Sequence, residues 1–184
     1  MLQGVIFTAH VAENHGLNGQ ECPNRSMRRK DNEVTNIHEI EEILKACKTC
    51  YLAMAEGSIP YVVPLSYGYA FTAEGALELY FHSAHEGRKL ELLKQNSKVC
   101  FCIANEGEPA AADTPCNAGY YYASVIGSGE VVFLHDSADK CAALSALVKQ
   151  QRGKEAVFLA DQAETVCVFK LVSTEFTGKR KSKP

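Results

Sequence analysis

The chain has 184 residues, of which 46% are hydrophobic and 22% charged, with a formal net charge of -3 and a pI near 6.1. This length and apolar content suit one well-buried domain, and the slightly acidic balance argues against a nucleic-acid-binding protein. The sequence lacks the roughly 18 consecutive apolar residues of a membrane span and the pattern of a signal peptide, so we expect a soluble, cytoplasmic protein.

The chain divides into a leader, a body and a basic tail. Residues 1–26 mix Gly, Asn, Gln and His without sustained periodicity, and an abrupt charged run then begins at Met27. We expect this leader to lie outside the core fold, as an appended arm or as a stretch upstream of a natural start at Met27. The body spans residues 27–177, and residues 178–184 form a tail that we expect to be solvated, with a weak contact to an acidic surface as the alternative.

The first half of the body predicts one helix and three strands. From Asn36, apolar residues recur at helical spacing, at Ile37, Ile40, Ile43, Leu44 and Cys47. Strands are predicted over residues 51–55, 59–71 and 77–82, separated by turns at Glu56-Gly57 and Glu74-Gly75. This order predicts a meander of antiparallel hairpins.

The second half predicts two more helices and further strands. A short helix over 88–95 leads to a strand over 99–104 and to a Pro- and Ala-rich loop over 106–117, which we interpret as mobile or as a lid. Strands over 120–126 and 130–134 meet at Gly127-Ser128-Gly129, where a bulge is expected, and Asp136 can cap a helix that ends around Arg152-Gly153. With a final strand over 165–177, the pattern predicts a mainly β (α+β) fold, a small antiparallel barrel with peripheral helices.

Two cysteine pairs have spacings that occur at functional sites. Cys47 and Cys50 have metal-knuckle or redox spacing, and Cys100 and Cys102 lie on one face of a predicted strand. A structural zinc site needs both pairs to converge with closed tetrahedral ligation. We favour buried structural thiols and no metal, and keep zinc and redox chemistry as alternatives. The eight cysteines suit free thiols better than a disulfide framework.

Two cations stand in the first turn of the 88–95 helix. The N-terminal end of a helix carries partial positive charge and unpaired N–H groups, so Arg88 and Lys89 are placed against the dipole unless an anion lies between them. A phosphate would turn this conflict into a binding site. The alternative is that both side chains extend into water.

Four short motifs occur in series along the body: Met27-Arg28-Arg29-Lys30-Asp31-Asn32-Glu33, Val63-Pro64-Leu65-Ser66-Tyr67-Gly68-Tyr69, Tyr80-Phe81-His82-Ser83-Ala84 with Glu86-Gly87-Arg88-Lys89, and Ser124-Val125-Ile126-Gly127-Ser128-Gly129. In order and approximate spacing they resemble the pyridoxamine 5'-phosphate oxidase-like flavoproteins, most closely the branch named for 5-nitroimidazole resistance. The resemblance covers essentially residues 27–176. It implies a split β-barrel that forms a homodimer and binds one FMN in each of two clefts at the subunit interface.

The resemblance also implies which residues bind the cofactor. The FMN phosphate would lie among Ser83, Ala84, Gly87, Arg88 and Lys89. The isoalloxazine ring would lie along Val63, Pro64, Leu65, Ser66 and Tyr67, whose alternative role is a plain barrel strand with an edge proline. The partner subunit would contribute Ser124, Val125, Ile126 and Gly127. His82, at the mouth of this site, is the candidate catalytic residue for proton transfer and a cofactor contact, with a structural histidine as the alternative.

The expected function is an FMN-dependent oxidoreductase that reduces a small planar acceptor, as a nitroimidazole reductase does. Asn32 stands where the branch usually carries arginine, and Tyr121 and Ala123 stand where basic residues are common, so the substrate side of the site is expected to differ. The run Tyr120-Tyr121-Tyr122 packs in the core or forms an aromatic wall for a planar substrate. The rival functions are a non-catalytic flavin or haem carrier or sensor of the same fold, and a structural dimer with an empty cleft.

Overall fold

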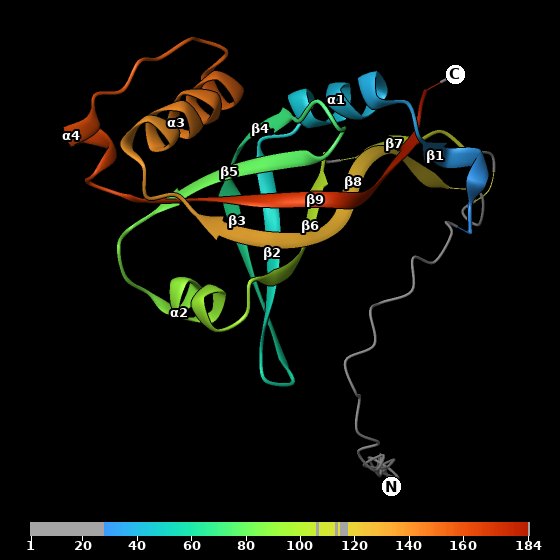
Figure 1. The fold of residues 1–184 in the computed structure, drawn as a ribbon. Helices are drawn as coiled ribbons and strands as arrows, with labels where there is room; N and C mark the ends of the chain where they lie inside the picture. The colour runs from blue at the N-terminus through green and yellow to red at the C-terminus, as the bar shows by residue number, and fades with distance from the viewer. Residues whose placement is uncertain (1–27, 106, 113, 115–117, 184) are drawn as a thin grey trace, which may run out of the picture.

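The computed structural model describes residues 28–105, 107–112, 114 and 118–183, which form a strongly curled sheet with helices around it (Figure 1). The leader over 1–26 and part of the 106–117 loop lie outside the described residues. The elements in chain order are η1 (Lys30–Asn32), β1 (Glu33–Val34), α1 (Ile37–Ala46), β2 (Thr49–Glu56), β3 (Ile59–Ser66), β4 (Gly68–Phe71), β5 (Leu77–Ser83), α2 (Arg88–Gln95), β6 (Lys98–Ala104), β7 (Glu108–Ala110), β8 (Gly119–Phe133), α3 (Ser137–Arg152), α4 (Ala160–Ala163) and β9 (Cys167–Lys181). Within these ranges, no helix is long and apolar enough to span a bilayer.

The sheet forms a barrel because its two end strands are neighbours in the chain. Antiparallel pairing gives the order β3-β2-β6-β8-β9-β5-β4, with β1 beside β9 and β7 beside β8. β3 and β4 stand at opposite ends of this order, yet only Tyr67 separates them in sequence. In Figure 1, β2 and β3 cross β5, β9 and β8 as two layers of the curled sheet. The mainly β split barrel that the sequence predicts is confirmed.

The strand predicted over 59–71 is wrong in one respect, because it is two strands with different partners. Pro64 of β3 lies opposite Tyr51 of β2, whereas Gly68 of β4 lies opposite Tyr80 of β5. At Gly68 the backbone passes so close to α3 that a Cβ atom would collide with the backbone at Leu147. The hairpins β2–β3 and β4–β5 exist as predicted, but the meander is interrupted between them.

Alternating strand residues fill the barrel and decide which cysteines are buried. Phe101 points into the core, so the residues on either side of it face outward, and Cys100 is exposed while Cys102 is half-buried. This corrects the prediction that both thiols are buried. Cys47 and Cys50 are buried as predicted, and their burial raises the pKa of both thiols. The described part of the chain contains no group of three or more His, Cys, Asp or Glu residues that could hold a metal ion.

Two side chains from distant elements hold the C-terminal end of α1. The Tyr67 hydroxyl donates to the carbonyls of Leu44 and Cys47 at 2.8 and 3.3 Å, and Gln150 Nε2 donates to the same carbonyls at 2.6 and 2.7 Å. The last carbonyls of a helix lack partners within the helix, so buried ones need such donors. These bonds fasten α1 to both the β3–β4 junction and α3.

The predicted helix after Asp136 is confirmed as α3. Asp136 accepts hydrogen bonds from the backbone of Ala138 and Asp139 at 2.8 and 3.2 Å, and the helix ends at Gly153 with φ of 66°. α3 and α4 cover the outer face of β5 and β9, where a second apolar cluster forms. Its buried members are Ala143, Leu144, Ala163 and Val168.

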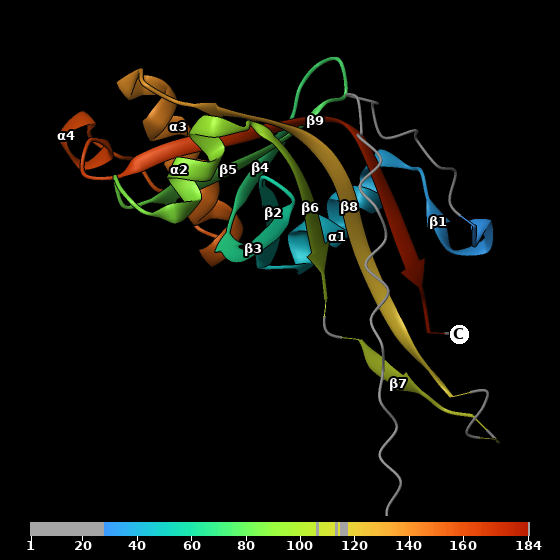
Figure 2. The same ribbon diagram turned by 90° about the horizontal axis from the view of Figure 1, so that it is seen from below.

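The two longest strands extend beyond the barrel. β8 is continuous, with its register shift between Ser128 and Glu130, where a bulge was expected. β9 runs to Lys181, past the predicted end at 177, and residues 178–181 pair with β8 and partly with β1. Part of the predicted solvated tail is therefore ordered strand. Figure 2 shows β7 and the beginning of β8 projecting away from the barrel.

Candidate functional site

The start of α2 combines an uncapped helix end with two cations. Gly87 precedes the helix with φ of 130°, a conformation that side chains rarely adopt, and it supplies no side-chain cap. Its carbonyl accepts hydrogen bonds from the backbone N–H groups of Leu90 and Glu91, at 2.9 and 3.2 Å. The first-turn N–H groups of Arg88 and Lys89 precede these bonded groups, and they lie at the positive end of the helix dipole. The combination suits a bound anion.

Arg88 links α2 to the β2–β3 hairpin. Its guanidinium contacts the Glu56 carboxylate at 2.5 Å and lies 4.6 Å from the ring centre of Tyr61. The Glu56 carboxylate raises the pKa of Arg88, so this side chain stays charged. Both members of the ion pair are about half exposed, which makes the pair weak and easily exchanged for another anion.

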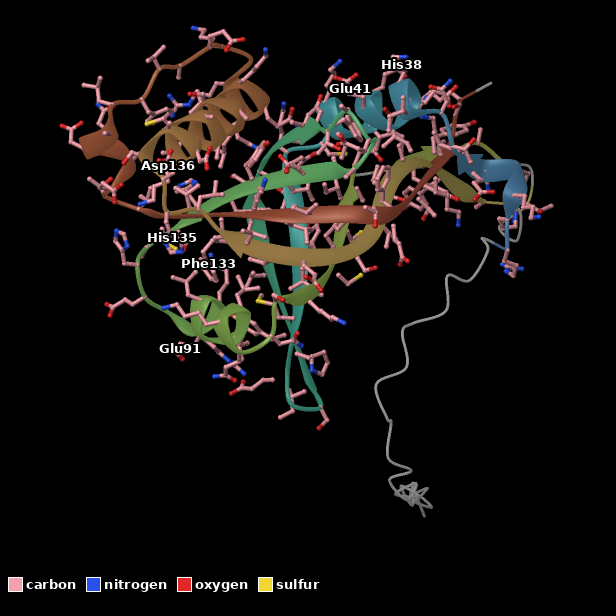
Figure 3. The ribbon with its side chains drawn as sticks, viewed as in Figure 1. His38, Glu41, Glu91, Phe133, His135 and Asp136 are labelled. Atoms are coloured by element: carbon pink, nitrogen blue, oxygen red, sulfur yellow. The ribbon has the colours of Figure 1, made fainter. Side chains whose placement is uncertain are left out.

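Lys89 lies over the aromatic end of the barrel. Its ammonium is 5.9 Å from the ring centre of Phe169, which stacks on Phe81 at 5.3 Å and contacts Phe133 at 5.9 Å. Partial burial lowers the pKa of Lys89, and the neighbouring Cys167 thiol opposes that shift. A half-buried cation gains from an anionic ligand more than an exposed one, because water screens it less. Figure 3 shows Phe133 at the end of β8 and His135 just after it.

We call the start of α2, with Gly87, Arg88 and Lys89, the cradle. His82 and Ser83 lie at the end of β5, a few residues before the cradle in the chain. Ser83 lies opposite Cys167 of β9, and its hydroxyl donates to the carbonyl of Ala84 at 2.9 Å. His82 is exposed, but burial of part of its ring lowers its pKa, and the nearby charge of Lys89 lowers it further. The lowered pKa favours the neutral form of the His82 imidazole near neutral pH.

β3 is an edge strand, and its face alternates between core and solvent. Val63 and Leu65 pack against the core, whereas Pro64 and Ser66 are exposed. Within the described residues β3 pairs only with β2, so its other edge carries backbone groups that can bind a ligand. A proline is compatible with such an edge because it has no N–H to donate.

Tyr67 differs from the other residues of its motif. Its side chain is fully buried beneath α1, and its carbonyl accepts a hydrogen bond from Gln151 Nε2 at 2.9 Å. Both groups are thus committed to the fold. Any ligand contact at this position would have to come from the Tyr67 backbone N–H, and the side chain acts on the site by fixing where β3 ends.

Ser124–Gly127 of β8 lie apart from the cradle, and only Ile126 of them is exposed on the outer face of the sheet. Ile126 continues a cross-strand row through Cys102 and Tyr51 to Pro64. At a spacing of about 4.8 Å between strands, Ile126 and Pro64 of one protomer are roughly 14 Å apart. Val125 points into the core, Gly127 is buried against Phe101, and Ser124 is half-buried. The structure therefore brings together the cradle and β3, but not Ser124–Gly127 of the same chain.

Sequence reasoning missed Glu56, Tyr61 and Phe169 as neighbours of the two cations. Glu56 looked like an ordinary turn residue, because the sequence around a hairpin does not indicate that its carboxylate will pair with Arg88. Phe169 is more than 75 residues away in the chain and reaches Lys89 only through the pairing of β5 with β9. No local pattern could have identified either contact.

Comparisons with known proteins bear on the family and the fold of the chain. The sequence model of the family described as pyridoxamine 5'-phosphate oxidase matches residues 36–180. No curated protein sequence matches the chain closely enough to count as a relative. Among solved structures, a candidate 5-nitroimidazole antibiotic resistance protein from Bacteroides thetaiotaomicron is 26% identical with a TM-score of 0.68, over 80% of this chain and 85% of that one.

Two further structures are similar. A FAD-binding protein from Mesorhizobium loti is 25% identical with a TM-score of 0.57, over 80% of this chain and 96% of that one. The flavocytochrome Anf3 from Azotobacter vinelandii has a TM-score of 0.69 over 88% of this chain and 74% of that one, but its 19% identity shows only a common fold.

Proposed function

Because the chain belongs to the pyridoxamine 5'-phosphate oxidase family, we propose that it is an FMN-binding oxidoreductase that reduces a small planar acceptor. The observation that carries this proposal is the cradle at the start of α2, where Arg88 and Lys89 flank uncapped backbone N–H groups beside the free edge of β3. A phosphate fits this donor set because it accepts both charge-assisted and backbone hydrogen bonds.

Different residues would bind different parts of the flavin. Arg88 and Lys89, with Gly87, Ser83 and Ala84, would hold the phosphate. The exposed edge of β3 over Val63–Ser66 would offer backbone hydrogen bonds to the polar rim of the ring, with Tyr67 holding the end of the strand in place. FMN would supply the two-electron chemistry, and the protein would orient it and exclude water.

His82 is the proposed proton donor to the acceptor. It stands at the end of β5, adjacent in sequence to the cradle, and its imidazole is partly accessible. Its lowered pKa keeps it neutral near pH 7, so it would deliver protons best in mildly acidic solution. Water would take over this role at higher pH.

We also propose that two copies form the complete site. The outer face of β3, β2, β6 and β8 exposes Val62, Tyr51 and Ile126 to 58%, 46% and 48%. A contiguous apolar face of this kind typically marks a protein interface. Since Ser124–Gly127 lie about three strands from β3 of the same chain, these residues would reach a flavin only across a dimer interface. The free thiols of Cys47, Cys50, Cys102, Cys141 and Cys167 favour a reducing, cytoplasmic location.

The first test compares FMN with riboflavin, which lacks the phosphate. Titration of the protein, followed by flavin fluorescence, should give tight FMN binding that Arg88→Gln weakens by about ten- to hundredfold, the value of one charge-assisted hydrogen bond. Riboflavin affinity should hardly change in the same variant. Lys94→Gln, at the opposite end of α2, is the matched control and should bind FMN as the wild type does.

Several outcomes would contradict the proposal. Equal losses of FMN and riboflavin affinity in Arg88→Gln would place the effect outside the phosphate. A protein that binds neither flavin would end the assignment. Tight binding without reoxidation of the reduced flavin by nitroaromatic or quinone acceptors would leave a flavin carrier or sensor. For the dimer, Tyr51→Glu should yield monomers in sedimentation velocity and weaken FMN binding, because it puts a charge at the centre of the apolar row.

FAD is the second candidate cofactor, because the 25% identical structure from Mesorhizobium loti is named as a FAD-binding protein. FMN and FAD carry the same first phosphate, so the cradle suits both. Heat release of the bound flavin and its separation by chromatography would distinguish them. FAD in place of FMN would correct the cofactor and leave the cradle assignment intact.

A further inference from the structure

The connection between β5 and α2 leads into the cradle but belongs to neither element. It runs over residues 84–87, between Ser83 at the end of β5 and Arg88 at the start of α2. Its last residue, Gly87, has φ of 130°, and the backbone of a glycine is the least restrained by its own side chain. The position of the first N–H groups of α2 therefore depends on what holds this connection in place.

One side chain of the connection reaches another part of the fold. The Nε2 atom of His85 lies 3.1 Å from the backbone carbonyl oxygen of Glu164, which directly follows α4. Because a carbonyl oxygen only accepts hydrogen bonds, His85 donates this bond through Nε2–H. Figure 1 shows α4 at the end of the sheet where β5 turns toward α2. The bond therefore spans the gap between the cradle side and the α4 side of this end.

Glu164 is itself held by α3. Its carboxylate accepts hydrogen bonds from Lys140 Nζ at 2.7 Å and from the Ser137 hydroxyl at 3.1 Å. The bond from Lys140 is the main reason that the pKa of Glu164 is lowered. Lys140 is only 8% exposed, so water screens this ion pair less than it screens an ion pair between two exposed side chains. The carbonyl that receives the His85 bond thus belongs to a residue with two further anchors.

The bond from His85 also continues the pairing of β5 with β9 beyond its last pair. That ladder ends with Ser83 opposite Cys167, and the residues before 167 lead back to α4. Ala163 of α4 is fully buried in the second apolar cluster, so moving α4 would expose apolar surface. His85 therefore ties the connection to a position that both packing and an ion pair determine.

Holding the connection in place before a ligand arrives favours binding. Fixing the backbone of one residue costs about 1 to 2 kcal/mol in conformational entropy. If residues 84–87 were loose, part of this cost would be subtracted from the affinity for an anion at α2. A connection that is already ordered in the free protein avoids that loss.

We propose that His85 is a positioning residue for the cradle, which places the first N–H groups of α2 by fastening residues 84–87 to the carbonyl of Glu164. It acts through the connection and does not touch the ligand. His85 stands between the two halves of the motif that contains the cradle and belongs to neither. The inference rests on the proposed phosphate site for its effect on binding, but the contact of His85 with Glu164 does not.

Fluorescence titrations of the full chain with FMN and riboflavin separate positioning from general damage to the fold. His85→Ala should weaken FMN binding about three- to fivefold, a modest loss because the bond is uncharged and exposed to water. Riboflavin, which has no phosphate, should bind the variant as it binds the wild type. His85→Gln should recover most of the FMN affinity, because its amide can donate to the same carbonyl. His38→Ala, an exposed histidine of α1, is the matched control and should bind FMN normally.

Amide hydrogen exchange in the flavin-free protein examines the connection without any ligand. The N–H groups of Leu90 and Glu91 bond to the carbonyl of Gly87, so they report on whether the start of α2 stays closed. Both should exchange at least about threefold faster in His85→Ala than in the wild type, and His85→Gln should restore slow exchange. A protein that binds neither flavin would end the proposed function, and this measurement would still decide whether His85 holds the connection.

Three results would overturn the proposal. The first is wild-type exchange at Leu90 and Glu91 in His85→Ala, which would mean that the connection keeps its place without this bond. The second is an equal loss of FMN and riboflavin affinity in that variant, which would mean general damage. The third is an FMN affinity in His85→Gln as low as in His85→Ala, which would separate the effect from the bond to Glu164.

Discussion

The strongest stability prediction concerns the two donors that hold the end of α1. Tyr67 and Gln150 donate to the same pair of carbonyls, those of Leu44 and Cys47. In Tyr67→Phe both carbonyls keep the short bonds from Gln150, so we expect a loss of only about 1 kcal/mol in the free energy of unfolding. In Gln150→Met the single tyrosine O–H is shared between the two carbonyls, at 2.8 Å to Leu44 and 3.3 Å to Cys47, and the loss should be about 1 to 2 kcal/mol.

The double variant should lose more than the sum of the single variants. Both buried carbonyls then lack a side-chain donor, and each costs about 1 to 3 kcal/mol when left unpaired. The expected total is about 4 kcal/mol, with a coupling energy of at least about 1 kcal/mol. Urea unfolding of the four proteins, followed by circular dichroism, gives this cycle directly. In a chain of this length the double variant should melt roughly 8 to 16 °C lower. Additivity within about 0.5 kcal/mol would refute the idea that the two side chains share one task.

Three further predictions follow from the charges described above. Glu56→Gln should strengthen FMN binding up to about fivefold, because the carboxylate that competes with phosphate for Arg88 is removed; unchanged or weaker binding in fluorescence titration would argue against that competition. If His82 donates a proton, kcat should rise as the pH falls through its lowered pKa, and His82→Gln should abolish this rise; an identical pH profile in the variant would exclude the role. Burial acts to raise the pKa of Glu78, but hydrogen bonds, including that from Lys170, outweigh it and hold the pKa below 4.5. The ionised carboxylate therefore stabilises the fold above that pH. This contribution to stability is lost as the pH falls through the lowered pKa. Urea unfolding should therefore show Glu78→Gln less stable than wild type at pH 7, with the difference shrinking as the pH falls through the lowered pKa, whereas a constant difference would contradict the linkage.

The sequence predicted best those features whose cause is local. The short helix predicted over 88–95 is α2, and α3 followed from the Asp136 cap and the glycine after Arg152. The strand predicted over 99–104 lies within β6, and the strands predicted over 120–126 and 130–134 together correspond to the single strand β8. In each case the information lies within a few residues of the element.

The failures all depend on pairing with distant residues. Residues 59–71 alternate like one strand, and the change of partner at Tyr67 is decided by β2, β5 and α3. The basic run after 177 has the composition of a solvated tail, yet Gly178 packs against Val34 and Ile40, so β9 continues. The outward position of Cys100 follows from the register of β6, which a short apolar run does not reveal.

For the candidate site, the cations were visible in the sequence but their surroundings were not. Arg88 and Lys89 stood out because their charge opposes the helix dipole. The carboxylate of Glu56 and the ring of Phe169, which set how strongly each cation can act on a ligand, come from the β2–β3 hairpin and from β9.

The central place of β9 has a consequence for how the protein is made. β9 follows every other described strand in the chain, yet it lies between β8 and β5 and also pairs with β1. While the ribosome is still adding residues before 167, the nascent chain holds β5 and β8 with unpaired edges, and these edges can pair with other chains. Closure therefore depends on contacts between residues far apart in sequence, which is typical of slow folding. Chaperone binding during synthesis would protect the exposed edges of β5 and β8 until β9 inserts between them.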